Sequence, residues 1–218
     1  MGLAHMTAAL HANEGDLTIA RMRHIGLVKS QSANRYITDS AAAGTAYATG
    51  RKTRNGSLGV DTAGCRLPNM TEILSGKGYA TGIVTTDKIS GATPSAFYTH
   101  QPQRSMTREI LSDLLRTQAL FVAGSSVSLF ESTGTERLDS LRAQGFTVLH
   151  DFEELPAPAP EKVALIACDR DAAQIKDGRD TAYLRTVTRY ALSFLSQKSK
   201  KGFFLLVEGA EIDHAAHN

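Results

Sequence analysis

The stretch Phe203-Phe204-Leu205-Leu206-Val207 is a run of five apolar residues that predicts a buried strand. A helical pattern over residues 182–196 precedes this run, and polar residues, beginning with Glu208, follow it directly. A helix that leads into an apolar strand is the repeating unit of α/β proteins. This part of the chain therefore predicts an α/β fold.

The same alternation of strand and helix continues back through the rest of the chain. Strands are predicted at 26–28, 35–37, 80–86, 121–123, 146–149 and 163–167. Helices are predicted at 6–10, 40–50, 71–75 and 107–119, and around Leu138 and Leu141. Residues 53–67 are rich in Gly, Asn and Asp and are predicted to form a loop. With no internal repeat and no domain linker, residues 1–218 are expected to form a single α/β domain.

Composition sets limits on the class of protein. The chain has 218 residues, is 42% hydrophobic and carries a formal net charge of +2. This length is enough to bury a sizeable core. Its Lys and Arg residues are dispersed and balanced by acids, and no apolar run is long enough to span a membrane, so we expect neither a nucleic-acid partner nor membrane insertion.

Two further local features concern cysteine and proline. Cys65 and Cys168 are the only cysteines, and they are far apart in sequence with no metal-like spacing, so no disulfide is expected between them. The stretch Pro156-Ala157-Pro158-Ala159-Pro160 is predicted to be a stiff, extended spacer, because a strand follows it at once.

A second informative stretch is Thr38-Asp39-Ser40-Ala41-Ala42-Ala43-Gly44-Thr45-Ala46, in which a serine heads a run of small, helix-forming residues. A serine in that position lies beside the free N–H groups of the helix N-terminus, where the helix dipole favours an anion. The stretch therefore predicts a phosphate site with Ser40 as a nucleophile. The same residues also make an ordinary N-cap, and this stretch alone does not separate the two interpretations.

The polar residues after the run 203–207 offer possible metal ligands. Glu208, Asp213, His214 and His217 place oxygen and imidazole donors close together, a donor set that suits a divalent cation such as zinc. Asp213 and His217 are four residues apart and can chelate one ion together. The alternative interpretation is a solvated polar loop in which these side chains have no such role.

Three groups of motifs carry a resemblance to a known family. The first group consists of Asp39-Ser40-Ala41-Ala42, Thr49-Gly50, Asn55-Gly56 and Leu58-Gly59-Val60-Asp61. The second consists of Ala92-Thr93-Pro94 followed by His100 and Arg104, and the third of Val207-Glu208-Gly209, Ile212-Asp213 and His217. In this order and at these intervals they resemble the alkaline phosphatase family over essentially the whole chain. The resemblance implies a layered α/β fold with a central, mostly parallel sheet flanked by helices.

The resemblance also implies an activity, which is the hydrolysis of phosphate monoesters through a phosphoserine intermediate on Ser40. Arg104 would bind two oxygens of the substrate phosphate or of inorganic phosphate. Asp213 and His217 would bind one Zn²⁺ ion, and Ser40 would be a ligand of a second. Glu208 and Thr93 would bind Mg²⁺. His100 lies four residues before Arg104, which would place both on one helix face, and a structural role is expected for it.

One position departs from the family pattern. Two residues before the metal-binding threonine the family commonly has Asp or His, whereas this chain has Gly91. The resemblance therefore does not supply a complete magnesium site. Asp87 and Ser90 are near enough in sequence to replace the missing side chain. His214 stands where some members have lysine, and we expect it to act outside the metal ligands or to face the phosphate through water.

The ends of the chain also bear on function. A family strand that ends in a metal-bridging aspartate is missing before Met1, and further ligands are missing after Asn218, so we expect an internal fragment with little or no activity by itself. The resemblance implies a periplasmic or extracellular parent protein, although the chain has no signal peptide, and a possible homodimer. Two alternatives are a phosphodiesterase or related hydrolase of the same superfamily and a non-catalytic module that binds metal or phosphate.

Overall fold

The computed structural model describes residues 2–125, 136–150, 159–167 and 178–217, together with residues 128, 130 and 175. Cys168 and most of the predicted proline-rich spacer lie outside the described residues. Cys65 is exposed and free. No helix in the described part of the chain is long and apolar enough to cross a membrane.

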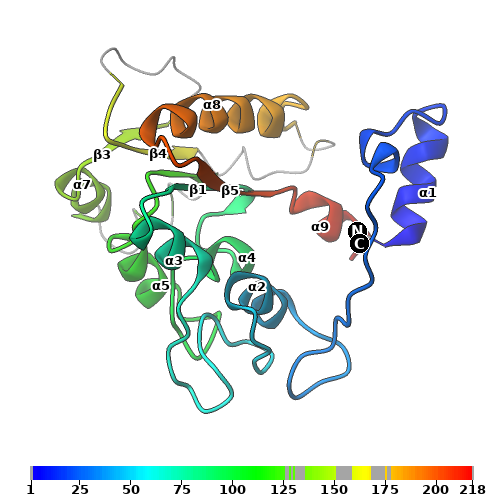
Figure 1. The fold of residues 1–218 in the computed structure, drawn as a ribbon, viewed down its shortest axis with the longest axis horizontal. Coiled ribbons are helices and arrows are strands. Elements are labelled where there is room, and N and C mark those ends of the chain that lie inside the picture. The colour runs from blue at the N-terminus through cyan, green and yellow to red at the C-terminus, as the bar shows by residue number, and fades with distance from the viewer. Residues whose placement is uncertain are drawn as a thin grey trace.

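A parallel sheet forms the centre of the molecule (Figure 1). Its strands are β1 (Ala80–Lys88), β2 (Phe121–Ser125), β3 (Phe146–Leu149), β4 (Lys162–Ala167) and β5 (Phe203–Glu208). The strand order is β3-β4-β2-β1-β5, and every pairing between neighbours is parallel. These strands confirm the predicted runs at 80–86, 121–123, 146–149, 163–167 and 203–207. The α/β prediction is therefore confirmed.

Helices cover both faces of this sheet. The helices of the described residues are α1 (Leu3–Ala12), α2 (Ser40–Thr49), α3 (Met70–Gly76), α4 (Ala92–Ser95), α5 (Thr107–Leu114), α7 (Glu136–Ala143), α8 (Tyr183–Lys198) and α9 (Glu211–Ala216), with a short 3₁₀ helix, η1 (Thr18–Arg21). On one face α8 packs its apolar side, including Val187 and Phe194, on Phe121 of β2. On the other face, residues of α2, α4, α5 and α7 share a second core with Ile83 of β1. Two apolar layers thus hold the sheet in place.

The N-terminal segment differs from the prediction. Residues 26–28 and 35–37 were predicted as strands, but neither forms one. Leu27 is fully exposed, and α1 has no buried residue. Figure 1 shows α1 standing apart from the sheet and its helices. The physical reason is that a three-residue segment becomes a strand only where a neighbouring strand pairs with its backbone, and none of the strands that the structure describes pairs with these residues.

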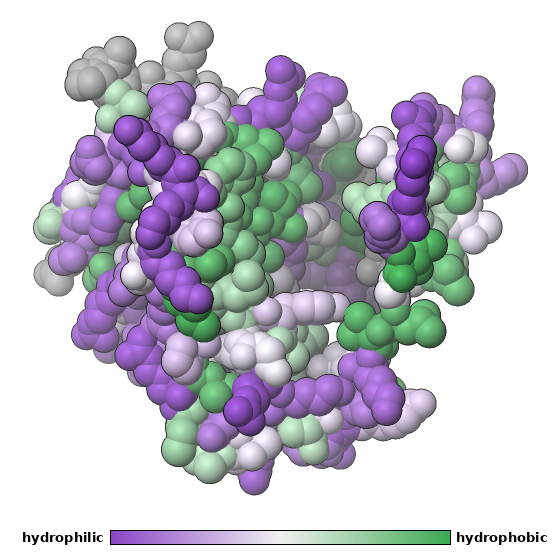
Figure 2. Space-filling view, viewed as in Figure 1, coloured by the Kyte–Doolittle hydropathy of each residue, from purple (hydrophilic) through white to green (hydrophobic). Residues whose placement is uncertain are grey.

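Two other predictions need correction. The run 203–207 was predicted to be buried, but β5 is at one edge of the described sheet and is only partly covered, with 38% of Phe203 and 42% of Val207 exposed. Figure 2 shows hydrophobic surface on this face over β5 and the adjoining part of α8. The helix predicted at 107–119 ends at Leu114, and the buried residue Ala119 leads into β2 without helical structure.

Candidate active site

The first part of the site is the start of α2. Asp39 is its N-cap residue, because Asp39 Oδ1 accepts a hydrogen bond of 2.9 Å from the backbone N–H of Ala42. Ser40 is the first residue of the helix and is exposed. The predicted helix over 40–50 is confirmed, and Gly50 ends it with a positive φ of 71°. Ser40 therefore stands where helix N–H groups favour an anion.

Arg104 reaches the same place from a distant loop. Its backbone N–H donates to Gly56 O at 2.7 Å, and its Nη1 lies 3.7 Å from Asp39 Oδ2. The same Asp39 oxygen accepts a hydrogen bond of 2.9 Å from Gly56 N–H. Asp39 therefore links the loop over 55–60 to the start of α2 and also attracts the guanidinium. Nothing in the sequence reasoning assigned this role to Asp39, although it stands next to the predicted nucleophile.

Glu208 is the last residue of β5 and pairs in register with Thr85 of β1. The Thr85 hydroxyl donates to Glu208 Oε2 at 2.6 Å. Burial is the largest influence on this carboxyl and raises its pKa. Hydrogen bonds from Thr85 and Thr93 act in the opposite direction, and the negative charge of Asp87 adds to the rise. A positive charge near Glu208 would therefore stabilise the ionised form.

The remaining predicted ligands lie on α9, which begins just beyond β5. The position of this helix is fixed by Ala210, whose N–H donates to the Thr86 hydroxyl at 2.9 Å. His217 Nδ1 lies 3.6 Å from Asp213 Oδ2, and both side chains are exposed. His214 Nδ1 lies 2.8 Å from a Glu211 carboxylate oxygen, which is the main reason that the pKa of His214 is raised.

A cavity of about 340 Å³ brings most of these groups together. Five of the six predicted site residues line it, namely Ser40, Thr93, Arg104, Glu208 and Asp213. His217 is not among the lining residues, whereas Asp87 and His214 are. A serine beside an arginine, with carboxylates close by, is a combination suited to binding a phosphate group and a cation at once.

Comparison with known proteins identifies the family. The family model described as alkaline phosphatase matches residues 3–122 and 138–218. The chain belongs to the alkaline phosphatase family. Alkaline phosphatase 4 of Bacillus subtilis is 34% identical over 190 residues, which cover 84% of this chain and 41% of the relative. The alkaline phosphatase of Escherichia coli is 29% identical over an alignment that covers 100% of this chain and 59% of the relative.

A solved alkaline phosphatase shares the fold. The enzyme from the Antarctic bacterium TAB5 superposes with a TM-score of 0.93 at 30% identity, covering 99% of this chain and 64% of that one. Two structures of TAB5 variants, in which a histidine is replaced by aspartate or glutamate, hold magnesium in the site named M3. The chain thus spans between 41% and 64% of the length of these alkaline phosphatases.

The donor atoms fit the metals of an alkaline phosphatase to different degrees. Asp213 and His217 form a pair of donors, and among the residues that the structure describes no group of three or more His, Cys, Asp or Glu side chains is arranged to hold a metal. This pair therefore offers two donors of the kinds that zinc binds, which is fewer than a closed tetrahedral site requires. Glu208 and Thr93 are oxygen donors that hydrogen bond to each other, and oxygen donors match the preference of magnesium.

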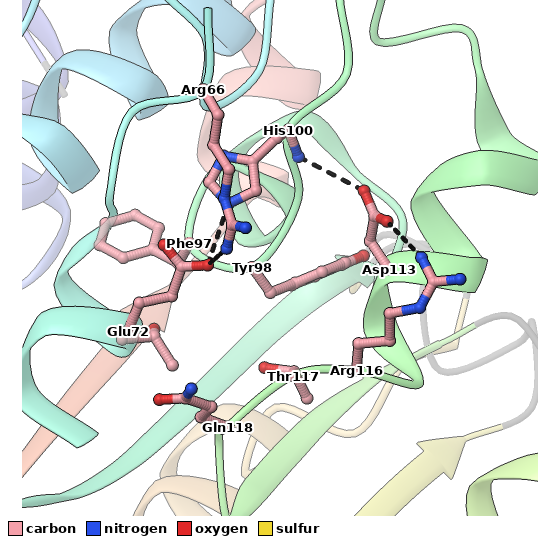
Figure 3. A pocket seen from close by; sticks show the side chains of 10 residues that line it. Arg66, Glu72, Phe97, Tyr98, His100, Asp113, Arg116, Thr117 and Gln118 are labelled. Carbon is pink, nitrogen blue, oxygen red and sulfur yellow. Dashed lines mark hydrogen bonds and ion pairs between the residues drawn. The ribbon is translucent and has the colours of Figure 1, made fainter. Parts of the chain in front are cut away.

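A second cavity is lined by residues of α3, of α5 and of the segment that includes His100 (Figure 3). His100, predicted to share a helix face with Arg104, lies in a non-helical segment. Its Nδ1 lies 2.8 Å from Gly59 O, and its Nε2 lies 3.1 Å from Glu72 Oε1. The expected structural role of His100 therefore has a geometric basis, because the imidazole joins the loop over 99–104 to the loop over 55–60 and to α3.

The charge of Glu72 supports this contact. Burial raises the pKa of Glu72, but hydrogen bonds from the Asn69 N–H, from His100 and from Arg66 outweigh the burial, so the pKa of Glu72 is lowered. The carboxylate consequently stays ionised against His100 down to acidic pH. On the opposite side of this cavity Asp113 pairs with Arg116 (Figure 3). Asp113 also accepts a hydrogen bond of 2.8 Å from Gln101 Nε2.

Proposed function

We propose that the protein to which this chain belongs hydrolyses phosphate monoesters, with Ser40 as the nucleophile. Membership of the alkaline phosphatase family supports the reaction class. The observation that carries the proposal is the cavity in which the exposed Ser40, at the N-terminus of α2, faces the same space as Arg104. A phosphate in this space meets both the partial positive charge of the helix and a planar guanidinium.

The chemistry of the proposed reaction involves two displacements at phosphorus. In the first, Ser40 Oγ forms a bond to phosphorus and loses its proton, while the bond from phosphorus to the alcohol oxygen breaks and the alcohol leaves with a proton. In the second, water attacks the phosphoserine, releases inorganic phosphate and returns the proton to Ser40 Oγ. Throughout, Arg104 holds two non-bridging oxygens and orients the phosphate for in-line attack.

This proposal includes metal ions, which named residues would bind as ligands. Asp213 and His217 would hold one zinc ion, Ser40 would contact a second, and Glu208 and Thr93 would hold magnesium. When bound, these cations neutralise phosphate charge and favour the deprotonated form of a hydroxyl group. Glu208 is suited to this role by its burial, since its ionised form has few stabilising partners besides two hydroxyl groups.

The test of this proposal is covalent labelling of Ser40 in the longest protein that the gene encodes around these 218 residues. With zinc and magnesium present, a ³²P-labelled aryl phosphate is expected to label the unmodified protein under acid quench and to leave Ser40→Ala unlabelled. Turnover should fall by at least about a thousandfold in that variant. Thr38→Ala, two residues earlier, is the matched control and should keep labelling.

The outcomes separate the alternatives. Labelling retained in Ser40→Ala would refute the assignment of the nucleophile. Phosphate binding without labelling or turnover would support a binding module instead, and faster hydrolysis of a diester than of a monoester would support a phosphodiesterase.

A further inference from the structure

We propose that Asp87 supplies the carboxylate that Gly91 lacks, so that Asp87, Glu208 and Thr93 together bind one divalent cation of the magnesium type. This inference rests on the proposed function, because it assigns a ligand to the magnesium site of the same cavity. It concerns a feature of this chain, since the family pattern places the missing side chain at position 91 and not at position 87.

The first observation is the space around Gly91. Its backbone angles are φ −56° and ψ 156°, which side chains of any kind tolerate, so the backbone does not require glycine here. A Cβ atom at this position would lie only 2.4 Å from Asp87 Oδ2 and 2.9 Å from Lys88 O. The Asp87 carboxylate therefore occupies the space in which a side chain at position 91 would begin.

The second observation is the direction in which Asp87 faces. Asp87 lines the same cavity as Glu208 and Thr93, and its charge acts on both Glu208 and His214. The Thr85 hydroxyl accepts a hydrogen bond of 3.0 Å from the Asp87 N–H and donates one of 2.6 Å to Glu208 Oε2. One side chain thus holds the backbone of Asp87 beside the carboxylate of Glu208.

The third observation is that the loop after Asp87 is fixed on both sides. Ile89 is completely buried, its N–H donates to Ser125 O at 3.1 Å, and its carbonyl accepts a bond of 2.8 Å from the Tyr98 hydroxyl. The Gly91 N–H donates to Lys88 O at 2.7 Å and closes the turn. Asp87 is therefore presented by a loop that is already ordered, which lowers the entropic cost of binding an ion.

The chemistry of the three side chains selects the class of ion. Two carboxylates and one hydroxyl are hard oxygen donors, which magnesium and manganese prefer and which leave room for bound water. The competing role for Asp87 is an ion pair with protonated His214, since the charge of Asp87 also acts on that imidazole. In that case the affinity for a cation would not depend on Asp87.

The experiment measures cation affinity directly, with Mn²⁺ as the probe. Mn²⁺ is titrated into the 218-residue chain, the free ion is followed by electron paramagnetic resonance, and Mg²⁺ is then added as a competitor. Asp87→Asn keeps the size of the side chain and removes its charge, and it should weaken Mn²⁺ binding at least about tenfold. The matched control is Asp139→Asn, because Asp139 is an exposed aspartate on α7.

A second variant tests whether a carboxylate at position 91 can replace the carboxylate of Asp87 in binding the cation. In the double variant Asp87→Ala with Gly91→Asp, the removed carboxylate vacates the space at position 91, and the backbone carbonyl of Lys88, 2.9 Å from the new Cβ, must still shift. Mn²⁺ affinity in the double variant should return to within about threefold of the unmodified chain, whereas Asp87→Ala alone should stay weak. Circular dichroism of each variant confirms that it is folded.

Three results would overturn the inference: no Mn²⁺ binding by the unmodified chain, unchanged affinity in Asp87→Asn, or a folded double variant that binds as weakly as Asp87→Ala. Phosphate ester hydrolysis in the longest protein that the gene encodes is measured separately. Cation binding that needs Asp87, without hydrolysis, would leave this inference intact and refute the proposed function. Hydrolysis together with unchanged Mn²⁺ affinity in Asp87→Asn would refute this inference alone.

Discussion

Replacement of Arg104 by alanine is expected to weaken the binding of inorganic phosphate by roughly 10- to 150-fold. The estimate takes about 1.5–3 kcal/mol for hydrogen bonds to a charged group, with each 1.4 kcal/mol equal to a factor of about ten in affinity. The contact with Asp39 leaves the guanidinium available to bind phosphate, because Arg104 Nη1 and Asp39 Oδ2 are 3.7 Å apart and 45% of the Arg104 side chain is exposed. An exposed pair of this kind contributes little by itself.

The local fold should survive this change. The hydrogen bond from Arg104 N–H to Gly56 O involves only the backbone, so it does not depend on the guanidinium. Asp39 keeps its bonds to the N–H groups of Ala42 and Gly56 after the side chain of Arg104 is removed. The effect on phosphate affinity should therefore be local and not a consequence of unfolding.

The assay is calorimetric titration of phosphate into the 218-residue chain at fixed salt, with zinc and magnesium present. Arg104→Lys should give an intermediate loss, because lysine keeps the charge but cannot bind two oxygens through one planar group. Arg142→Ala is the control, since Arg142 lies on α7 and pairs with Asp139. Phosphate affinity within twofold of the unmodified chain in Arg104→Ala would show that the guanidinium does not bind phosphate.

Two further predictions concern Glu208, which is partly buried in the site, and the buried Tyr98. Burial raises the pKa of Glu208, so this group favours folding below its ordinary pKa of 4.5, and that contribution is lost as pH rises through the raised value. Without cations, Glu208→Gln should therefore be more stable than the unmodified chain at pH 8 but not at pH 4. The measurement is the free energy of unfolding in urea, and an equal difference between the two proteins at both pH values would contradict the prediction. Tyr98→Phe should cost about 1–3 kcal/mol in urea unfolding, because it leaves the buried Ile89 carbonyl without its 2.8 Å hydrogen bond. Tyr36→Phe, at an exposed tyrosine, should cost almost nothing, and equal stability of the two variants would refute the role of Tyr98.

The sequence predicted the elements whose own residues determine them. The helix after Asp39 has an N-cap, a run of alanines and a terminal glycine, and it begins and ends as predicted. The apolar run over 203–207 forms a strand, but its burial depends on neighbours that a single segment does not reveal, and β5 lies at the edge of the described sheet. The same holds for residues 26–28, because their apolar character does not show whether another strand is available to pair with them.

The candidate site was predictable to a similar degree. Five of the six residues chosen from the motifs line one cavity. The sixth, His217, follows the end of α9, is not among the lining residues and pairs with Asp213. Asp87 was considered only for its nearness in sequence to Gly91. The ligand role that we propose for Asp87 depends on the space that Gly91 leaves open, and the sequence does not show this space because it is formed by the folded loop after β1.

The motif residues without reactive groups explain why the site depends on so long a stretch of sequence. Asn55 accepts a bond from Asp39 N–H through its side chain and donates one of 3.0 Å to Ile37 O, which holds the chain just before Ser40. Gly59 has a φ of 61°, and a Cβ there would lie 2.1 Å from Thr99 O, so only glycine allows the two loops to approach. The approach places Leu58 opposite Gln101 in a short antiparallel bridge, three residues before Arg104.

These contacts connect Ser40 at the start of α2 to Arg104 through the loop over 55–60. The loop over 55–60 is bonded on one side to Asp39 and on the other to the segment that carries Arg104. His100 reinforces the second connection through its contacts with Gly59 and Glu72. A change in this loop should therefore displace Arg104 relative to Ser40, because the loop is bonded both to Asp39 and to the segment that carries Arg104.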